Sequence, residues 1–196
     1  PMLRKMSEKM KEHGALAGIQ LAYSGINGPN LYSKEVPLAV TAAPIRTFTN
    51  DPVQARALDK SDIRDLRRWF VNAAKRSKEA GFDLICLYGA HGFGIFQHFL
   101  SRATNQRNDE YGGSLENRAR FVNEVIAEMK DAVGDTMGIT LRVSLDETIG
   151  DLQARLISSA ARDPPSPIRS FPRRSKKAGS RTFANVSAVT SASPAT

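Results

Sequence analysis

Apolar residues along this chain follow two patterns in turn: helical spacing and short continuous runs. Helical spacing, as at Met2, Leu3, Met6 and Met10, is typical of a helix with one buried face. Short runs such as Leu84-Ile85-Cys86-Leu87, bounded by glycine, are typical of buried strands. We therefore predict helices over residues 2–13, 61–80 and 115–133, and strands over residues 16–22, 83–88 and 138–144.

The order of these elements predicts the class of fold. Strands that alternate with helices are usually parallel and joined by crossover helices. A closed (β/α)8 barrel has eight strands and typically ~250 residues, whereas this chain has 196 residues and three predicted strands. We therefore expect an α/β fold, a partial (β/α)8 TIM barrel of about three βα units.

Long segments separate the predicted elements. Residues 24–60 contain prolines at positions 29, 37, 44 and 52, and residues 89–113 are rich in Gly, Asn and Asp. Both are predicted to be loops, and loops of this length are often functional. Ser61 and Ser114 are predicted to cap the helices that follow them.

Composition restricts where the protein acts. No apolar stretch reaches the ~20 residues of a membrane helix, and residues 1–14 have no apolar signal-peptide core. The single cysteine, Cys86, cannot form an internal disulfide. We therefore expect a cytoplasmic protein without a membrane partner.

The sequence changes character near residue 150. Residues 151–196 hold eight Lys or Arg and two Asp, hence +6 of the net charge of +8, together with nine serines and half of the prolines. We predict two parts: residues 1–150 as a partial barrel domain and residues 151–196 as a disordered Ser/Pro/Arg-rich tail. Two origins of the tail stay open, a frameshifted reading frame and a genuine basic linker.

Three stretches carry a resemblance to a known family. They are YGAHG from Tyr88, NQRNDEYGGSLENRARF from Asn105 and ITLRVS from Ile139. They resemble the old yellow enzyme family of NADH:flavin oxidoreductases, whose cofactor is FMN. The Tyr-Gly-Ala-His version resembles the branch that contains trimethylamine and dimethylamine dehydrogenases. The resemblance covers residues 2–148.

The resemblance implies four site residues. Gln20 and Arg142 resemble cofactor-binding positions: an amide suits the pyrimidine edge of a flavin, and a cation stabilises the negative charge that develops on reduction. Tyr88 and His91 resemble the catalytic pair that faces the substrate, and the Asp that completes the triad in this branch belongs to a later strand. For each residue the alternative of a polar group satisfied locally stays open.

The resemblance also bears on residues around the site. Phe93 stands where many ene-reductases have a proton-donating Tyr, which favours amine oxidation. The stretch from Asn105 to Arg118 is expected to hold the preceding loop over a helix, with glycines that permit turns. Cys86 is expected in the core. The chain has no CxxC motif, so the iron–sulfur cluster of the amine dehydrogenases has no ligands here and no metal is predicted.

These observations leave three functions. The first is an FMN-dependent oxidoreductase that transfers hydride between an amine or NAD(P)H and FMN, with an amine or enone as substrate. The second is a catalytically inactive barrel remnant. The third, a basic nucleic-acid binder, is not expected, because the tail lacks interleaved aromatic residues. We also expect self-association through open sheet edges. FMN binding by this chain alone is expected to be weak or absent, because the phosphate-binding loops lie outside the resemblance.

Overall fold

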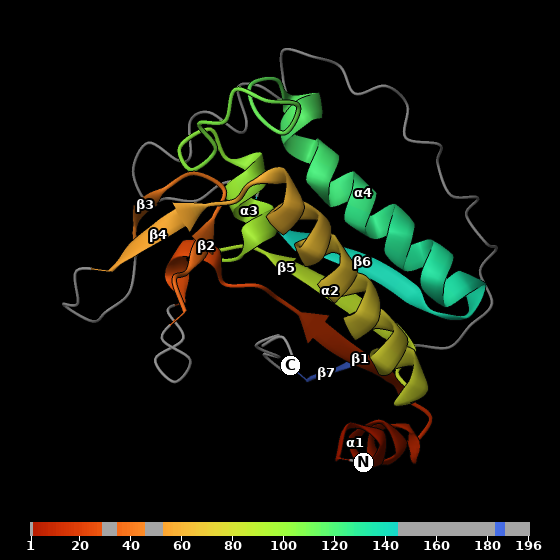
Figure 1. Cartoon of the computed structure of the whole chain (residues 1–196). Helices are drawn as coiled ribbons and strands as arrows, with labels where there is room; N and C mark the ends of the chain where they lie inside the picture. The colour runs from red at the N-terminus through yellow and green to blue at the C-terminus, as the bar shows by residue number, and fades with distance from the viewer. Residues whose placement is uncertain (1, 29–34, 46–52, 145–182, 187–196) are drawn as a thin grey trace.

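The computed structural model describes residues 2–28, 35–45, 53–144 and 183–186. In this part of the chain the main sheet has four parallel strands in the order β6-β5-β1-β7 (Figure 1). The strands are β1 (Leu16–Leu21), β5 (Leu84–Gly89), β6 (Gly138–Val143) and β7 (Phe183–Val186). The three predicted strands are confirmed as β1, β5 and β6, with ends within one residue of the prediction.

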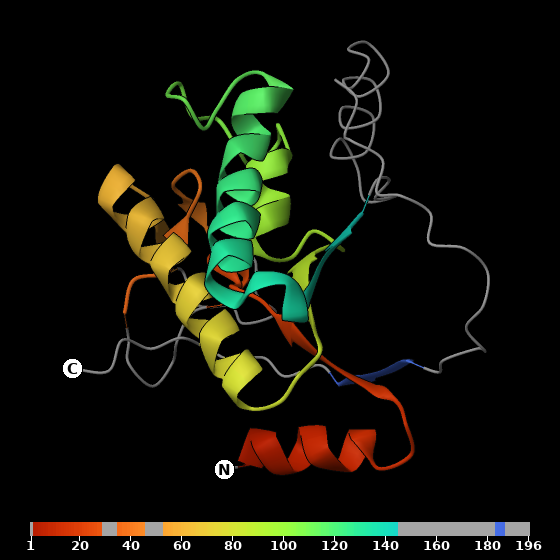
Figure 2. The same ribbon diagram turned by 90° about the vertical axis from the view of Figure 1, so that its right-hand side faces the viewer.

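The two long helices lie on one side of this sheet. The described helices are α1 (Met2–Lys11), α2 (Lys60–Glu79), α3 (Ile95–Leu100) and α4 (Leu115–Val133), with short 3-10 turns η1 (Gly25–Asn27) and η2 (Gly134–Thr136). α2 and α4 pack against each other on the same face (Figure 2). A doubly wound sheet carries helices on both faces, whereas a barrel carries them all outside. The expected partial barrel is therefore confirmed.

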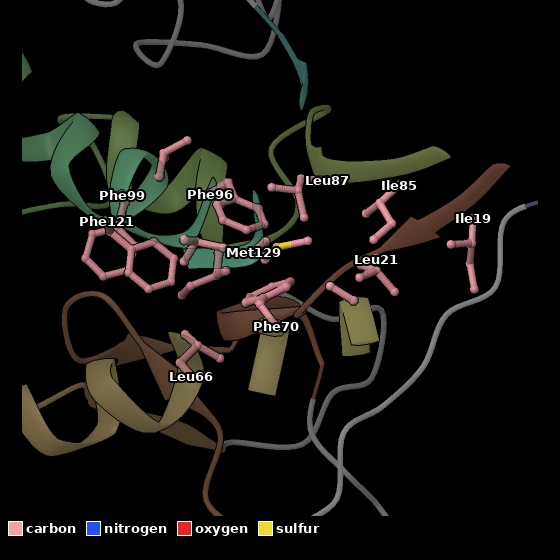
Figure 3. Packing of buried hydrophobic residues seen from close by; sticks show 14 of the residues in the cluster. Ile19, Leu21, Leu66, Phe70, Ile85, Leu87, Phe96, Phe99, Phe121 and Met129 are labelled. Atoms are coloured by element: carbon pink, nitrogen blue, oxygen red, sulfur yellow. The ribbon is translucent and has the colours of Figure 1, made fainter. Parts of the chain in front are cut away.

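The hydrophobic core fills the space between the sheet and these helices. Ile19 and Leu21 of β1 and Ile85 and Leu87 of β5 are at most 2% exposed and pack toward α2 and α4 (Figure 3). Side chains alternate between the two faces of a strand. The intervening residues of β1, β5 and β6 therefore occupy the opposite face, which corresponds to the inside of a barrel.

α2 begins at a cap other than the predicted one. Asp59, and not Ser61, is the N-cap: its carboxylate accepts hydrogen bonds from the backbone N–H groups of Ser61 and Asp62. Asp62 completes a capping box by accepting from the Asp59 backbone N–H at 2.8 Å. Asp59, Ser61 and Asp62 are all good cap residues, and the position of the first helical turn decides between them. Ser114 caps α4 as predicted.

The predicted loop over residues 24–60 contains regular structure. A second sheet in the order β2-β4-β3 is formed by β2 (Leu38–Ala39), β3 (Ala43–Pro44) and β4 (Gln54–Ala57). The expectation of an irregular segment was wrong here, because strands of two to four residues are too short to show a period of two.

The predicted loop over residues 89–113 contains α3. Residues 95–99 are all buried, and at six residues the helix is shorter than two turns, too short for a helical period to be recognised in the sequence. Phe99 of α3 stacks on Phe121 of α4 with ring centroids 4.3 Å apart, and Phe96 lies 4.8 Å from Phe70 of α2. α3 therefore joins the two long helices to the end of β5.

α1 covers the N-terminal ends of the strands (Figures 1 and 2). Buried Ser7 donates a hydrogen bond to the Ala80 carbonyl, and Lys11 donates to the Gly81 carbonyl at 2.7 Å and pairs with Asp83 at 2.8 Å. The carboxyl ends of the strands, where barrel active sites lie, are at the opposite end of the sheet.

Four residues of the predicted tail form a strand. β7 pairs in parallel with β1, from Leu16↔Phe183 to Ile19↔Val186. An unpaired strand edge offers N–H and C=O groups to any extended segment, and β7 uses the edge of β1 in this way. Residues 145–182 and 187–196 lie outside the described residues, so the disordered tail stays a prediction.

None of the described helices is both long and apolar enough to cross a membrane.

Candidate active site

The site lies at the carboxyl ends of β5 and β6, on the face of the sheet opposite the helices. The parallel register pairs Tyr88 of β5 with Arg142 of β6. Because Ile85 and Leu87 face the helices, Tyr88 faces the other way, as does Arg142. The guanidinium carbon of Arg142 lies 5.6 Å from the centroid of the Tyr88 ring, within reach of a cation–π contact.

His91 completes a three-residue cluster with this pair. Its Nδ1 lies 3.1 Å from the Tyr88 hydroxyl, and its Nε2 lies 3.4 Å from Nη2 of Arg142. The rings of Tyr88 and His91 meet edge to face, with centroids 6.2 Å apart. The structure therefore brings together three of the four predicted site residues.

Hydrogen-bond chemistry favours one tautomer of His91 in this arrangement. A guanidinium group can only donate, so Nε2 of His91 accepts from Arg142 and carries no proton. The remaining proton of the neutral ring is then on Nδ1, which donates to the Tyr88 hydroxyl oxygen. The hydroxyl hydrogen of Tyr88 is left to donate to a third group.

The backbone of His91 is held in an unusual conformation. With φ of +60°, His91 is the only residue other than glycine with a positive φ in the described ranges, and such positions cluster at functional sites. Its backbone N–H donates to Oγ of Ser144, one residue past β6, at 2.8 Å. Ser144 was missed as a site residue, although its position two residues after Arg142 on the same strand face could have indicated it.

Gln20 lies on the same face, on the neighbouring strand. The register places Gln20 beside Cys86, which is two residues before Tyr88 on β5. Among the described residues, no contact joins Gln20 to the cluster. Gln20 is 9% exposed, and its Oε1 is buried without a hydrogen-bond partner in the described residues. A buried unpaired amide oxygen costs free energy unless a ligand or another group satisfies it. The Gln20 amide oxygen is therefore suited to accept a hydrogen bond from a donor on the edge of a bound flavin.

Arg142 also fits such a ligand. It is exposed and, among the described residues, has no carboxylate within ion-pair distance. A guanidinium group without an acidic partner can interact with a ligand that carries or develops negative charge. Gln20 and Arg142 thus present an amide and a cation on one face of the sheet, which suits the pyrimidine end of FMN.

Cys86 is not in the core, in contrast to the expectation. It shares the face of Gln20 and Tyr88 and is half-buried. The sequence could not separate the two faces of β5, because the strand is apolar on both sides from Leu84 to Leu87.

The residues from Asn105 to Arg118 hold the loop that precedes α4, as expected. Asn105 is 4% exposed; its Nδ2 donates to the carbonyls of Phe99 and Tyr111 at 2.8 Å each, and its Oδ1 accepts from the Arg107 N–H at 3.1 Å. Arg118, fully buried, donates to the carbonyl oxygens of Leu100 and Gly113. Desolvation lowers the pKa of Arg118.

Two further contacts fix this loop to its neighbours. Arg107 pairs with Asp109 at 2.5 Å and donates to the carbonyls of Val40 and Leu58. The hydrogen bonds from Arg107 hold the pKa of Asp109 below its ordinary value. The Tyr111 hydroxyl donates to Glu124 of α4 at 2.9 Å, and burial is the main cause of its raised pKa.

The two adjacent glycines of this stretch are required for different reasons. Gly113 has φ of +81° and open space around it, so only the backbone conformation requires glycine. A Cβ on Gly112 would lie 2.0 Å from the Arg107 carbonyl oxygen, so Gly112 is required by close approach of the chain. Both glycines serve turn geometry as expected, because the Gly112 N–H also closes a turn on the Asp109 carbonyl at 3.0 Å.

Parallel βα units with all helices outside, and a cluster of polar side chains at the carboxyl ends of the strands, define a segment of a β/α barrel enzyme. The chain belongs to the NADH:flavin oxidoreductase / NADH oxidase family, whose model matches residues 1–158.

Named relatives and solved structures agree with this assignment. The chain is 43% identical over 129 residues to an NADPH dehydrogenase of Geobacillus sp. (strain WCH70), covering 66% of this chain and 36% of the relative. It is 32% identical over 170 residues to dimethylamine dehydrogenase of Hyphomicrobium sp. (strain x), covering 82% of this chain and 22% of the relative. Histamine dehydrogenase from Rhizobium sp. 4-9 is 82% identical with a TM-score of 0.74, over 77% of this chain and 22% of that chain. The chain therefore spans well under half the length of these relatives.

Proposed function

We propose that this chain provides the strand-end catalytic residues and part of the cofactor site of an FMN-dependent oxidoreductase that oxidises amines. The observation that carries the proposal is the contact of His91 with both Tyr88 and Arg142, on the sheet face where Gln20 has an unsatisfied amide oxygen. FMN, when bound, supplies the hydride acceptor. Family membership supports this cofactor.

Each of the four residues has a role in this proposal. Gln20 and Arg142 bind the pyrimidine end of the flavin, and Arg142 stabilises negative charge there. His91 donates from Nδ1 to the Tyr88 oxygen, which orients the hydroxyl. Tyr88 then presents its hydroxyl hydrogen, and one lone pair, to the substrate amine.

An amine is the substrate class that the site favours. Phe93, 41% exposed and two residues after His91, has no proton to donate to the carbon that becomes carbanionic when an alkene accepts hydride. Histamine dehydrogenase and the 6-hydroxypseudooxynicotine amine oxidase from Pseudomonas geniculata N1, a structure 39% identical with a TM-score of 0.73, are both named for amine chemistry. These names support an amine substrate here.

The second candidate is a reductase that takes hydride from NAD(P)H, which the similarity to an NADPH dehydrogenase favours. The two candidates differ in what reduces the flavin. With FMN bound and oxygen excluded, we expect histamine or dimethylamine to bleach the flavin absorbance and NADPH not to do so. Bleaching by NADPH alone would replace the amine proposal with the second candidate.

Cofactor binding is the first test of the proposal. Only the ring end of FMN meets residues of this chain, so we use ~0.3 kcal/mol per heavy atom for about 20 atoms. This gives about 6 kcal/mol and a dissociation constant on the order of 0.1 mM. Titration of dilute FMN with the chain is expected to quench flavin fluorescence saturably in this range.

A matched pair of arginine variants makes the test specific. Arg142→Ala removes a charged hydrogen-bond partner worth about 1.5–3 kcal/mol and should weaken binding ten-fold or more. Arg64→Ala removes an exposed arginine from α2 and should leave binding unchanged. Absence of saturable quenching, or equal affinity of the two variants, would refute the cofactor site.

Two finer points belong to the same proposal. We place the protein in the cytoplasm, where the half-buried thiol of Cys86 stays reduced.

We also propose that chains associate through β6, which is the last strand of the described sheet and has no partner on its outer edge there. Light scattering should then show a molar mass that rises with concentration, and a constant monomer mass would contradict the association.

A further inference from the structure

The two proposed cofactor-binding residues are on strands that do not touch. Gln20 is on β1 and Arg142 is on β6, and β5 lies between them. Neighbouring strands are about 4.8 Å apart, so the two backbones are about 9.5 Å apart. Any single ligand that contacts both side chains must cross β5.

Two side chains near the end of β5 share the face that such a ligand would cross, and Tyr88 is the one that contacts the substrate in the proposed function. Tyr88 is level with Arg142, and Cys86 is level with Gln20. Leu84 shares their face but lies two residues before Cys86, about 6.7 Å further from the carboxyl end of the strand. The thiol of Cys86 is half-buried, and its only described hydrogen bond is a 3.9 Å contact from Sγ to the Leu87 carbonyl.

A second observation at this level points to a ligand. Gln20 is directly beside Cys86 in the register, and its buried Oε1 has no hydrogen-bond partner among the described residues. On the other side of Cys86 the register places Thr140, whose hydroxyl makes, among the described residues, only a long 3.4 Å bond to the Ile85 carbonyl. In this row the small thiol of Cys86 lies in the middle, and the Gln20 amide on one side has an acceptor that no described residue uses.

We infer that the Cys86 side chain forms the floor of the isoalloxazine site and contacts the ring of the bound flavin. This inference rests on the proposed function, which supplies the ligand. A thiol is small enough for a flat ring to lie over it and contact both Gln20 and Arg142. Sulfur also makes favourable contacts with aromatic rings. A larger side chain at position 86 would lift the ring away from both residues.

Thiol labelling tests the inference, because Cys86 is the only cysteine of the chain. N-ethylmaleimide adds the thiol S–H across its double bond, and mass spectrometry of the intact chain measures the rate. FMN at ten times its dissociation constant should slow labelling about ten-fold, with a midpoint equal to that of fluorescence quenching. Riboflavin should protect equally at the same fractional saturation, and inorganic phosphate should not protect. Cys86→Ser must abolish labelling.

A size substitution gives an independent measurement that does not need a reactive thiol. Cys86→Phe should weaken FMN binding at least ten-fold, and far more than Cys86→Ser, which preserves the size of the side chain. Leu84→Phe is the matched control: it adds an aromatic ring to the same face one pair lower, and FMN affinity should not change. Circular dichroism shows whether the variants fold.

The outcomes separate this inference from the proposed function. Quenching without protection, or equal affinities of Cys86→Phe and Leu84→Phe, would overturn the role of Cys86 and leave FMN binding in place. Protection by inorganic phosphate alone would also overturn it, because the ring would not be the group above the thiol. Absence of quenching would overturn the proposed function and this inference together.

Discussion

Replacement of Asn105 tests whether the loop before α4 depends on one buried amide. Asn105 is 4% exposed and makes three hydrogen bonds to backbone groups, at 2.8, 2.8 and 3.1 Å. Asn105→Ala removes all three and leaves buried carbonyl oxygens without this donor. With about 1 kcal/mol for each bond, we expect a loss of about 3 kcal/mol in the free energy of unfolding.

Urea unfolding measures this loss. The fluorescence of Trp69, the single tryptophan, reports on α2, and circular dichroism reports on the helices. For a slope of about 2 kcal/mol per molar urea, the midpoint should fall by about 1.5 M. Asn108→Ala, at an exposed asparagine three residues later, should shift the midpoint by less than about 0.25 M.

An isosteric variant isolates the donors. Asn105→Asp keeps the shape but places a carboxylate oxygen against the carbonyls of Phe99 and Tyr111. We expect a loss at neutral pH at least as large as for alanine, and a smaller loss in acid, because protonation of the new carboxyl restores a donor. Equal midpoints for Asn105→Ala and Asn108→Ala would refute this reasoning.

Three more predictions follow from the geometry. Gly112→Ala, which places a Cβ 2.0 Å from a carbonyl oxygen, should lower the urea midpoint far more than Gly113→Ala, whose left-handed backbone costs about 1–2 kcal/mol; equal midpoints would contradict this. Neutral His91 should carry its proton on Nδ1 in long-range proton–nitrogen spectra, and Arg142→Ala should weaken this preference; a proton on Nε2 in the native chain would be evidence against the cluster. The pKa of Asp109 is held below its ordinary value of 3.8, so its pairing stabilises the fold above that pH and is lost as pH falls through the lower folded value. Asp109→Asn should therefore flatten the decline of stability below about pH 4, and an unchanged slope would show that other carboxyls cause it.

Fold elements with a strong pattern could be predicted from the sequence. The runs at β5 and β6 and the stripe of α4 through Phe121, Val125 and Met129 gave boundaries close to those observed. α3 could not be predicted, because a helix of six residues makes fewer than two turns and is too short to show a helical period. Its existence depends on the aromatic contacts with α2 and α4, which are tertiary.

The site could be predicted in part. Tyr88 and Arg142 stand out as polar residues at the ends of apolar strands, and parallel strands place such residues at one edge. The contact between His91 and Arg142 could not be predicted, because it depends on the left-handed backbone of His91 and on the bond to Ser144. The position of Cys86 depends on which face of β5 the helices cover, and that is decided by packing.

The central position of β5 has a consequence for how the site moves. Its amide groups pair with β1 on one side and β6 on the other, so the hydrogens of β5 should exchange with solvent only when the whole domain opens. Tyr88 is on this strand, whereas His91 follows it in a turn, immediately before glycines with positive φ at positions 92 and 94. Local opening of that turn can release the imidazole while the phenol stays in place. The two halves of the candidate catalytic pair therefore belong to different cooperative units, and substrate entry can displace one without disturbing the other.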